Sequence, residues 1–209
     1  MPDIPNLNRL CRSLAMLDAI MSIEWQFRYY SFNSKWAPGL EMASIRNGSG
    51  DDLFLLFDKN GAIMKGFDHE SNMSPYQFTP QKIWPGIYDT VPASFKDFLE
   101  EPAFTAPDCT FCVWREMKDT AWHCGEIEYP AGDRDPDGSE RILALFNNNP
   151  QSYCDWAGEY YEKEIPLDAV VKIYGHEPLS IKLVHALNAD LALKDLEKDI
   201  AEIGFPTKN

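Results

Sequence analysis

Three cysteines and one histidine near the middle of the chain are residue types that zinc prefers. They are Cys109, Cys112, His123 and Cys124. A zinc knuckle needs a tight turn that brings the first two sulfurs to one point, but 109–113 has the composition of a strand, where residues three apart face opposite sides. We therefore expect these cysteines to be small buried side chains, and we expect no stoichiometric zinc.

An acidic segment farther along the chain begins like a calcium loop. In Asp133-Arg-Asp135-Pro-Asp137-Gly138, alternate carboxylates precede a glycine, as in loops that wrap oxygen ligands round a hard cation. The match fails later, because Glu140 stands where an apolar side chain is expected and Ala144 where a bidentate glutamate is expected. The segment therefore favours a solvated turn, with calcium binding as the alternative.

Three histidines stand near carboxylates and are candidates for acid–base dyads. The sets are His69-Glu70, His123 with Glu126 and Glu128, and His176-Glu177. None lies in a known catalytic pattern, since the chain has no Gly-x-Ser-x-Gly elbow, no phosphate-binding loop and no His-Glu-x-x-His. We interpret each set as a surface or capping contact, and we expect no cofactor.

The N-terminal third must supply the framework for any site. Apolar residues at three- and four-residue steps predict an amphipathic helix over 6–21. From Ile23 to Phe32 the period changes to two, which predicts a strand with Trp25, Phe27 and Tyr29 facing inward. This cluster of aromatic side chains is typical of a core.

Three more strands are predicted over 40–46, 53–57 and 62–67, completing a four-stranded antiparallel meander over 23–68. The turn before the second of them contains Gly48, Gly50 and Asp51, and its glycines supply the positive φ angles that tight hairpins need.

The remainder is predicted to be mainly helical. The proline-rich stretch 69–92 reads as a connection, followed by a short helix over 93–101 and strands over 109–117 and 122–129. Helices are then predicted over 151–163 and in two segments of the apolar pattern between Ile181 and Ile203. The predicted class is α+β: an N-terminal helix, an antiparallel β-meander, and C-terminal helices packed on the sheet.

Length and composition agree with a folded chain. The 209 residues, 44% of them hydrophobic, suit one domain, with a possible division into 1–105 and 106–209. No apolar run approaches the ~20 residues of a membrane helix, and the N-terminus lacks the features of a secretory signal. Five cysteines do not suggest a disulfide scaffold. The cytoplasm is the expected location.

The formal net charge of −14 argues against nucleic acid as a ligand, because duplex binding depends on Lys and Arg that displace counterions from phosphates. The acidic excess is uneven. Nine basic and 13 acidic side chains lie in 1–105, whereas ten basic and 20 acidic lie in 106–209. A potential of one sign steers partners of the other, so the charge favours a basic protein partner, or serves only to keep the chain in solution.

Three segments within residues 47–99 form a recognisable pattern: the glycine-rich turn and strand of 47–58, Gly66-Phe67-Asp68-His69-Glu70, and Ser94-Phe95-Lys96-Asp97-Phe98-Leu99. In this pattern the chain resembles the SUKH superfamily, which includes bacterial immunity proteins of toxin systems and a fungal regulator of cell-wall synthesis. The resemblance implies an antitoxin-like binding protein that covers the active site of a toxin. The segment 106–209 has no counterpart in that family.

The sequence thus predicts a non-enzymatic, protein-binding module whose basic partner meets an acidic surface in the second half. The candidate binding residues are Asp133, Asp135, Asp137, Glu140, Asp155, Glu159 and Glu162. Positions 155, 159 and 162 share one face of the predicted helix, which is equally consistent with ordinary solvation. A metal-dependent hydrolase and a regulatory scaffold are the alternatives.

Overall fold

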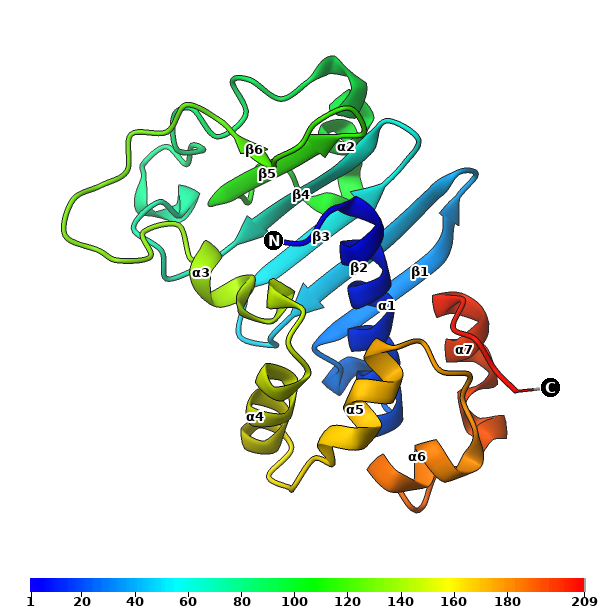
Figure 1. Cartoon of the computed structure of the whole chain (residues 1–209). Helices are drawn as coiled ribbons and strands as arrows, with labels where there is room; N and C mark the ends of the chain where they lie inside the picture. Colours follow the sequence, from blue (N-terminus) through cyan, green and yellow to red (C-terminus); the bar gives the residue numbers. More distant parts are fainter. Residues whose placement is uncertain (209) are drawn as a thin grey trace. The chain divides into compact units, whose positions relative to one another are not determined.

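The computed structural model describes residues 1–208 and confirms the α+β class (Figure 1). The chain forms two compact units. The first unit combines Met1–Trp36 with the described residues from Leu145 onward, and the second is Ala37–Ala144. Within residues 1–208, no helix is both long and apolar enough to cross a lipid bilayer.

Helices make up most of the first unit. They are α1 (Ile4–Met21), α4 (Pro150–Tyr160), α5 (Leu167–Tyr174), α6 (Ile181–Leu187) and α7 (Glu197–Ile203). The apolar face of α1 is buried, and it packs against α5, α6 and α7 (Figure 1). Asp3 caps α1 by accepting the N–H of Asn6 at 3.0 Å. The helix predicted over 6–21 is thus confirmed.

The strand predicted from Ile23 is wrong over its first half. Residues Trp25–Phe27 form a 3₁₀ turn, and strand β1 (Tyr30–Ala37) begins only at Tyr30. Trp25 and Phe27 are exposed, whereas Tyr30 and Phe32 are buried, which reverses the predicted faces.

The buried carboxylate of Asp18 explains the late start of β1. Its Oδ2 accepts the N–H groups of Tyr29 and Tyr30 at 2.8 and 2.7 Å, and the Tyr153 hydroxyl donates to Oδ1 at 3.3 Å. These bonds satisfy the backbone N–H groups of Tyr29 and Tyr30 with a side chain instead of a neighbouring strand. Such a buried acceptor is favourable only when its hydrogen bonds are made.

The second unit contains an antiparallel sheet with neighbouring strands in chain order. Its strands are β2 (Leu40–Arg46), β3 (Asp52–Phe57), β4 (Gly61–Phe67), β5 (Phe111–Glu116) and β6 (His123–Cys124). The meander of β2, β3 and β4 was predicted nearly to the residue. In its register Arg46 faces Asp52, and Asp52 faces Phe67. Phe54 of β3 packs against Phe104, which also contacts Phe98 of α2 (Lys96–Glu100).

Lys65 of β4 is fully buried, although a lysine is among the residues least often found inside a protein. Its ammonium donates to Asp52 Oδ1 at 2.9 Å and to the carbonyl of Asp108 at 2.7 Å. The Phe54 ring lies 5.3 Å from the same nitrogen. The charge is therefore paired, and it ties β4 to the segment that leads into β5.

Other boundaries differ from the sequence pattern. The strand predicted over 122–129 is only two residues long in the structure, as β6. The helix predicted over 151–163 ends at Tyr160, the last residue of α4. Helix α5 was not predicted. The last segment, 191–203, splits into a 3₁₀ turn (Leu193–Leu196) and α7, which Gly204 ends at φ 70°.

The environment of Asp18 makes the stability of the fold depend on pH. Burial raises the pKa of Asp18 to about 7, although hydrogen bonds from Tyr30 and Tyr29 oppose the rise. Because this pKa lies above the unfolded value of about 3.9, the folded chain binds the proton more tightly. Stability should therefore fall by roughly 2–3 kcal/mol between pH 5 and pH 8. Asp18→Asn keeps an acceptor for the two N–H groups and should remove this component of the slope.

Urea denaturation at pH 5, 6, 7 and 8 measures the effect, with Asp168→Asn on α5 as the control. Parallel stability curves for the wild type and Asp18→Asn would contradict the assignment.

Candidate functional site

The first candidate site begins at the turn between β2 and β3. Gly48 and Gly50 have φ angles of 73° and 114°, which side chains rarely adopt. Asn47 closes the turn, since its Oδ1 accepts the N–H groups of Ser49 and Asp51 at 2.9 and 3.1 Å. The turn places the Asp51 carboxylate in a buried position directly before β3.

The β3–β4 register brings a second carboxylate beside Asp51. Because Asp52 pairs with Phe67, Asp51 directly before β3 and Asp68 directly after β4 are neighbours. Asp68 is also buried. The next residue, His69, donates its backbone N–H to Asp51 Oδ1 at 3.0 Å, and its ring Nδ1 lies 2.6 Å from the same oxygen.

Arg141 completes the arrangement, which we call the carboxylate cluster: Asp51, Asp68, His69 and Arg141. One nitrogen, Nη2, lies 2.7 Å from Asp51 Oδ2 and 2.8 Å from Asp68 Oδ2. Arg141 belongs to the short helix α3 (Ser139–Ile142), which lies at the end of β4 (Figure 1). A single guanidinium thus bridges two buried carboxylates.

The acidic loop 133–141 holds Arg141 in place. Asp135 accepts the N–H groups of Glu140 and Arg141 at 2.9 and 3.0 Å, and Asp137 accepts that of Ser139 at 2.9 Å. Thr110 Oγ1 ties the loop to the sheet by donating to the Asp137 carbonyl at 2.7 Å. A Cβ on Gly138 would lie 2.3 Å from Asp68 Oδ2, so the backbone reaches the carboxylate only with glycine there.

The charges in the cluster stabilise one another. Burial favours the neutral form of Asp51, but hydrogen bonds from His69 and Arg141 outweigh it and hold the pKa of this carboxyl below its usual value. The bond to Asp51 raises the pKa of the half-exposed His69 imidazole. Partial burial opposes the charge of Arg141, yet the two carboxylates raise the pKa of its guanidinium further. At neutral pH Asp51 and Arg141 are therefore ionised.

The cluster contains metal-ligand chemistry as well as an Asp–His dyad. Among residues 1–208, Asp51, Asp68 and His69 form the one group of at least three His, Cys, Asp or Glu side chains with ligand atoms all within 4.8 Å of one another. The ligand set is two carboxylates and one imidazole. The sequence interpretation used Asp51 only as a turn residue, and Arg141 was missed altogether.

The Cys/His residues considered as zinc ligands from the sequence are not brought together as a ligand group in the part of the chain described. Cys109 and Cys112 are buried, as predicted, and Cys124 is exposed. Cys109 Sγ lies 3.2 Å from the carbonyl of Phe111 and donates to it. His123 pairs with Asp119 at 3.4 Å rather than with Glu126 or Glu128.

The candidate binding residues fall into two groups in different units. In the second unit, Asp135 and Asp137 serve as backbone acceptors of the acidic loop and Asp137 is buried. Asp133 accepts from Asn72, and Glu140 pairs with Arg134. This half of the predicted surface is therefore largely committed to holding the loop, as expected for a turn.

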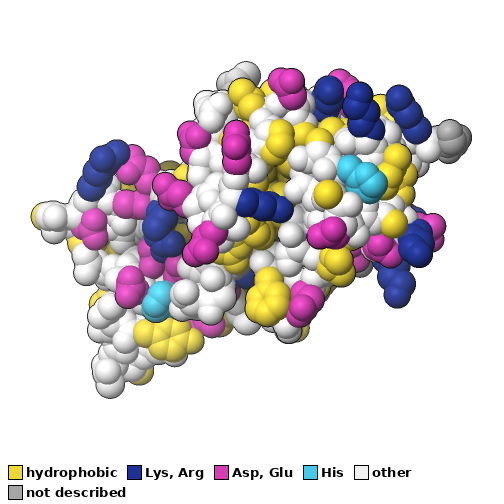
Figure 2. Space-filling model, turned by 90° about the horizontal axis from the view of Figure 1, so that it is seen from below, with side chains coloured by type: hydrophobic (Ala, Val, Ile, Leu, Met, Phe, Trp, Pro, Cys, Tyr) yellow, Lys and Arg dark blue, Asp and Glu magenta, His cyan; other side chains and the backbone are white. Residues whose placement is uncertain are grey.

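The other group lies in the first unit. Asp155 and Glu159 are exposed on α4, but Glu162 lies beyond the helix end at φ 52°, so the three do not share one helix face. Figure 2 shows acidic side chains interspersed with basic and apolar ones over the face in view, not as one continuous acidic patch.

His176 does not form the expected pair with Glu177. Its Nε2 lies 2.9 Å from the carbonyl of Arg9, and burial lowers its pKa. This contact suits a neutral imidazole that donates to the carbonyl, and it gives His176 a structural role.

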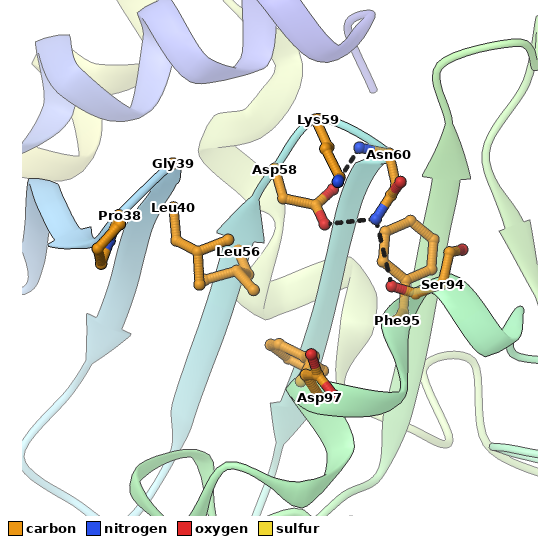
Figure 3. A pocket seen from close by; sticks show the side chains of 11 residues that line it. Pro38, Gly39, Leu40, Leu56, Asp58, Lys59, Asn60, Ser94, Phe95 and Asp97 are labelled. Atoms are coloured by element: carbon orange, nitrogen blue, oxygen red, sulfur yellow. Dashed lines mark hydrogen bonds between the residues drawn. The ribbon is translucent and has the colours of Figure 1, made fainter.

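A cleft of about 520 Å³ opens between the β3–β4 turn and the start of α2 (Figure 3). Its floor is apolar, with Leu56, Phe95 and Phe98. On the rim, Asp58 accepts the backbone N–H groups of Asn60 and Gly61 at 2.7 and 2.9 Å and the Asn60 side-chain amide at 2.8 Å. The Asp58 carboxylate thus holds the β3–β4 turn together. Because its oxygens already accept these hydrogen bonds, it argues against a polar ligand in this cleft.

The second candidate site is the exposed turn 23–27 of the first unit, which we call the aromatic turn. Ile23, Trp25 and Phe27 are 63%, 54% and 56% exposed. The carbonyl of Phe27 accepts from the Tyr160 hydroxyl at 3.4 Å, and the Tyr160 ring stacks on Trp156 of the same helix.

No protein-family model, curated protein or solved structure matches this chain.

The turn that carries Asp51 should depend on glycine. Replacing Gly48 or Gly50 by Val should destabilise the fold by about 1–3 kcal/mol, because a β-branched side chain is strained at positive φ. Ser49→Val in the same turn is the control and should have a smaller effect. Equilibrium denaturation measures all three, and equal stability of the Gly48 and Gly50 variants with the wild type would contradict the turn assignment.

The Asp51–His69 bond can be tested separately. Asp51→Asn removes the charge that raises the pKa of His69, so the His69 pKa should fall towards its ordinary value of about 6.5. Titration of the imidazole C–H resonances by NMR measures the change. His123, which faces Asp119, serves as the internal control, and an unchanged His69 titration would show that the bond is not formed in solution.

Proposed function

We propose that this protein is a non-enzymatic protein-binding module and that the aromatic turn is the centre of its binding surface. The observation that carries the proposal is the exposure of three large apolar side chains within five residues, each more than half accessible to water. Large apolar groups gathered on a surface mark interaction sites. Tryptophan in particular dominates the binding energy at protein interfaces.

The backbone of the aromatic turn is fixed before any partner arrives. Arg28 donates to the carbonyls of Ser22 and Ile23 at 2.8 and 3.0 Å and forms an ion pair with Asp199 of α7. The N–H groups of Phe27 and Arg28 bond to the carbonyls of Glu24 and Trp25. A surface held in this way loses little conformational entropy on binding. Exposed rings on a rigid turn therefore favour recognition over a loosely ordered connection.

The charge around the turn favours a basic partner. Glu24 lies within the turn, and Glu202 lines the same shallow depression as Trp25. The nearest arginine, Arg28, is already paired with Asp199. An apolar centre with an acidic rim fits a protein that presents apolar groups among Lys and Arg. Asp155, Glu159 and Glu162 lie in this same unit and extend its acidic character.

An immunity role is the narrower form of the proposal. The resemblance of 47–99 to the SUKH superfamily implies a protein that covers a toxin active site, and a basic nuclease toxin would suit both the acidic rim and the net charge of −14.

The experiment compares three baits: the wild type, Trp25→Ala/Phe27→Ala, and Leu167→Ala/Val171→Ala, a matched pair of exposed apolar residues on α5. A protein retained by the wild type is identified, purified and titrated. We expect the aromatic-turn variant to bind it at least about tenfold more weakly, whereas the α5 variant binds normally. Thermal melting should show all three folded, because the replaced side chains are exposed.

A charge test accompanies the titration. Glu24→Lys/Glu202→Lys should slow association and weaken its dependence on salt. Equal affinity of the wild type and the aromatic-turn variant for every partner found would contradict the proposal.

A further inference from the structure

We propose that a cavity formed by α5, α6 and the segment beyond α7 binds a small phosphate monoester that carries hydroxyl groups. The cavity lies within the first unit and shares no residue with the aromatic turn or the carboxylate cluster. Its volume is about 300 Å³, at the lower end of the range for small-molecule sites. It therefore has room for a phosphate group together with a short carbon chain.

Three lysines from separate segments line this cavity: Lys172 of α5, Lys182 of α6 and Lys208 beyond α7. Their ammonium groups form no hydrogen bond or ion pair with any other residue of 1–208. Such a gathering of cations stands out in a chain with a net charge of −14. Like charges around one cavity repel one another, and an anion placed between them would relieve that repulsion. The lysines therefore indicate an anionic ligand.

Backbone hydrogen bonds hold the segments of the cavity together. The N–H of Leu179 donates to the carbonyl of Pro206 at 2.9 Å, and the N–H of Lys208 donates to the carbonyl of Leu179 at 3.2 Å. The N–H of Glu177 donates to the carbonyl of Lys172 at 2.9 Å and closes the connection after α5. The backbone that carries Lys172 and Lys208 is therefore fixed before a ligand arrives, which reduces the entropy lost on binding.

The type of cation favours phosphate over carboxylate. Planar carboxylates are best matched by the paired donors of arginine, and none of the residues that line the cavity, all of them within 1–208, is an arginine. The lysine ammonium group is a compact charge with three donors, so several of them can approach a tetrahedral phosphate from different directions. A phosphate monoester carries a charge of about −1.5 to −2 at neutral pH and can thus engage more than one lysine.

Other lining residues indicate what the phosphate is attached to. Asp168 and Glu177 face the same cavity, and in the described part of the chain neither forms an ion pair with one of its lysines. Ionised carboxylates only accept hydrogen bonds, and hydroxyl groups of a ligand would supply the donors. Ala169 and Leu183 add an apolar wall for carbon atoms. These neighbours favour a hydroxylated ester over inorganic phosphate.

The acidic excess of the whole chain opposes an anion only weakly. At physiological ionic strength, exposed charges more than about 8 Å apart are largely screened from one another. The charges that line the cavity therefore decide the affinity, and among them three lysines outnumber two carboxylates.

Calorimetric titration of the full chain with glycerol phosphate, at constant ionic strength, tests the proposal. The wild type should bind about one molecule per chain. Lys172→Gln/Lys182→Gln should weaken binding at least about tenfold, because charge-assisted hydrogen bonds are lost. Lys194→Gln/Lys198→Gln is the matched control, since it removes the same charge from exposed positions of the same unit that do not line the cavity. It should bind glycerol phosphate as the wild type does.

Two further measurements locate the ligand and test its hydroxyl groups. In NMR spectra, glycerol phosphate should shift the backbone amide signals of Lys172, Lys182 and Lys208 most. Asp168→Ala/Glu177→Ala should tighten the binding of inorganic phosphate but abolish the preference for glycerol phosphate, because it removes both the repulsion and the hydroxyl acceptors. A preference that survives this change would overturn the assignment of a hydroxylated ligand.

Three results would overturn the site itself. They are absence of binding of glycerol phosphate to the wild type at millimolar concentration, unchanged affinity of Lys172→Gln/Lys182→Gln, and an equal loss in both lysine pairs. The last result would show that only the overall charge of the chain matters. All four replaced lysines are exposed, so thermal melting should show that both variants are folded.

Discussion

Asp51 and Asp68 lie side by side with little access to water, and a single guanidinium nitrogen bonds to both. Two ionised carboxylates in such a position would repel each other and lose their hydration. The positive charge between them is therefore a requirement, and Arg141 meets it from another part of the chain. This contact joins the turn before β3, the end of β4 and the acidic loop.

The same contact gives two acidic residues of the loop a structural role. Asp135 and Asp137 accept backbone N–H groups in order to build α3, and α3 carries Arg141. The carboxylates that look most like a binding surface in the sequence thus position the one cation that the buried pair needs. In the first unit, by contrast, the charged side chains of Asp18 and Arg28 hold the backbone, and the side chains of the aromatic turn remain exposed.

The sequence predicted those parts of the fold that short-range patterns control. Alternating apolar residues and the glycines of the turn before β3 indicated β2, β3 and β4, and three- and four-residue spacing indicated α1. The aromatic turn was predicted as a buried strand because its composition is that of a strand. The hydrogen bonds that prevent a strand here join Asp18 to Tyr29 and Tyr30, at sequence separations of 11 and 12. The periodicity of apolar residues gives no sign of such bonds.

The carboxylate cluster was beyond reach for a related reason. Asp51 and Asp68 each belong to a recognisable turn or strand end, but Arg141 is 90 and 73 positions away from them. Nothing in the local sequence distinguishes it from a surface arginine. Lys65 is similar, since only the register of β4 and the path of 105–108 show that its charge is paired.

A double-mutant cycle tests most directly whether Arg141 and the buried carboxylates interact in solution. Unfolding free energies are measured for the wild type, Asp68→Asn, Arg141→Gln and the double variant at neutral pH and low salt. If the guanidinium bridges the carboxylates in solution, the two substitutions should be coupled by more than about 1 kcal/mol, because either one alone already breaks the contact. Effects that add to within about 0.3–0.5 kcal/mol would show that the charges act independently and would contradict the account.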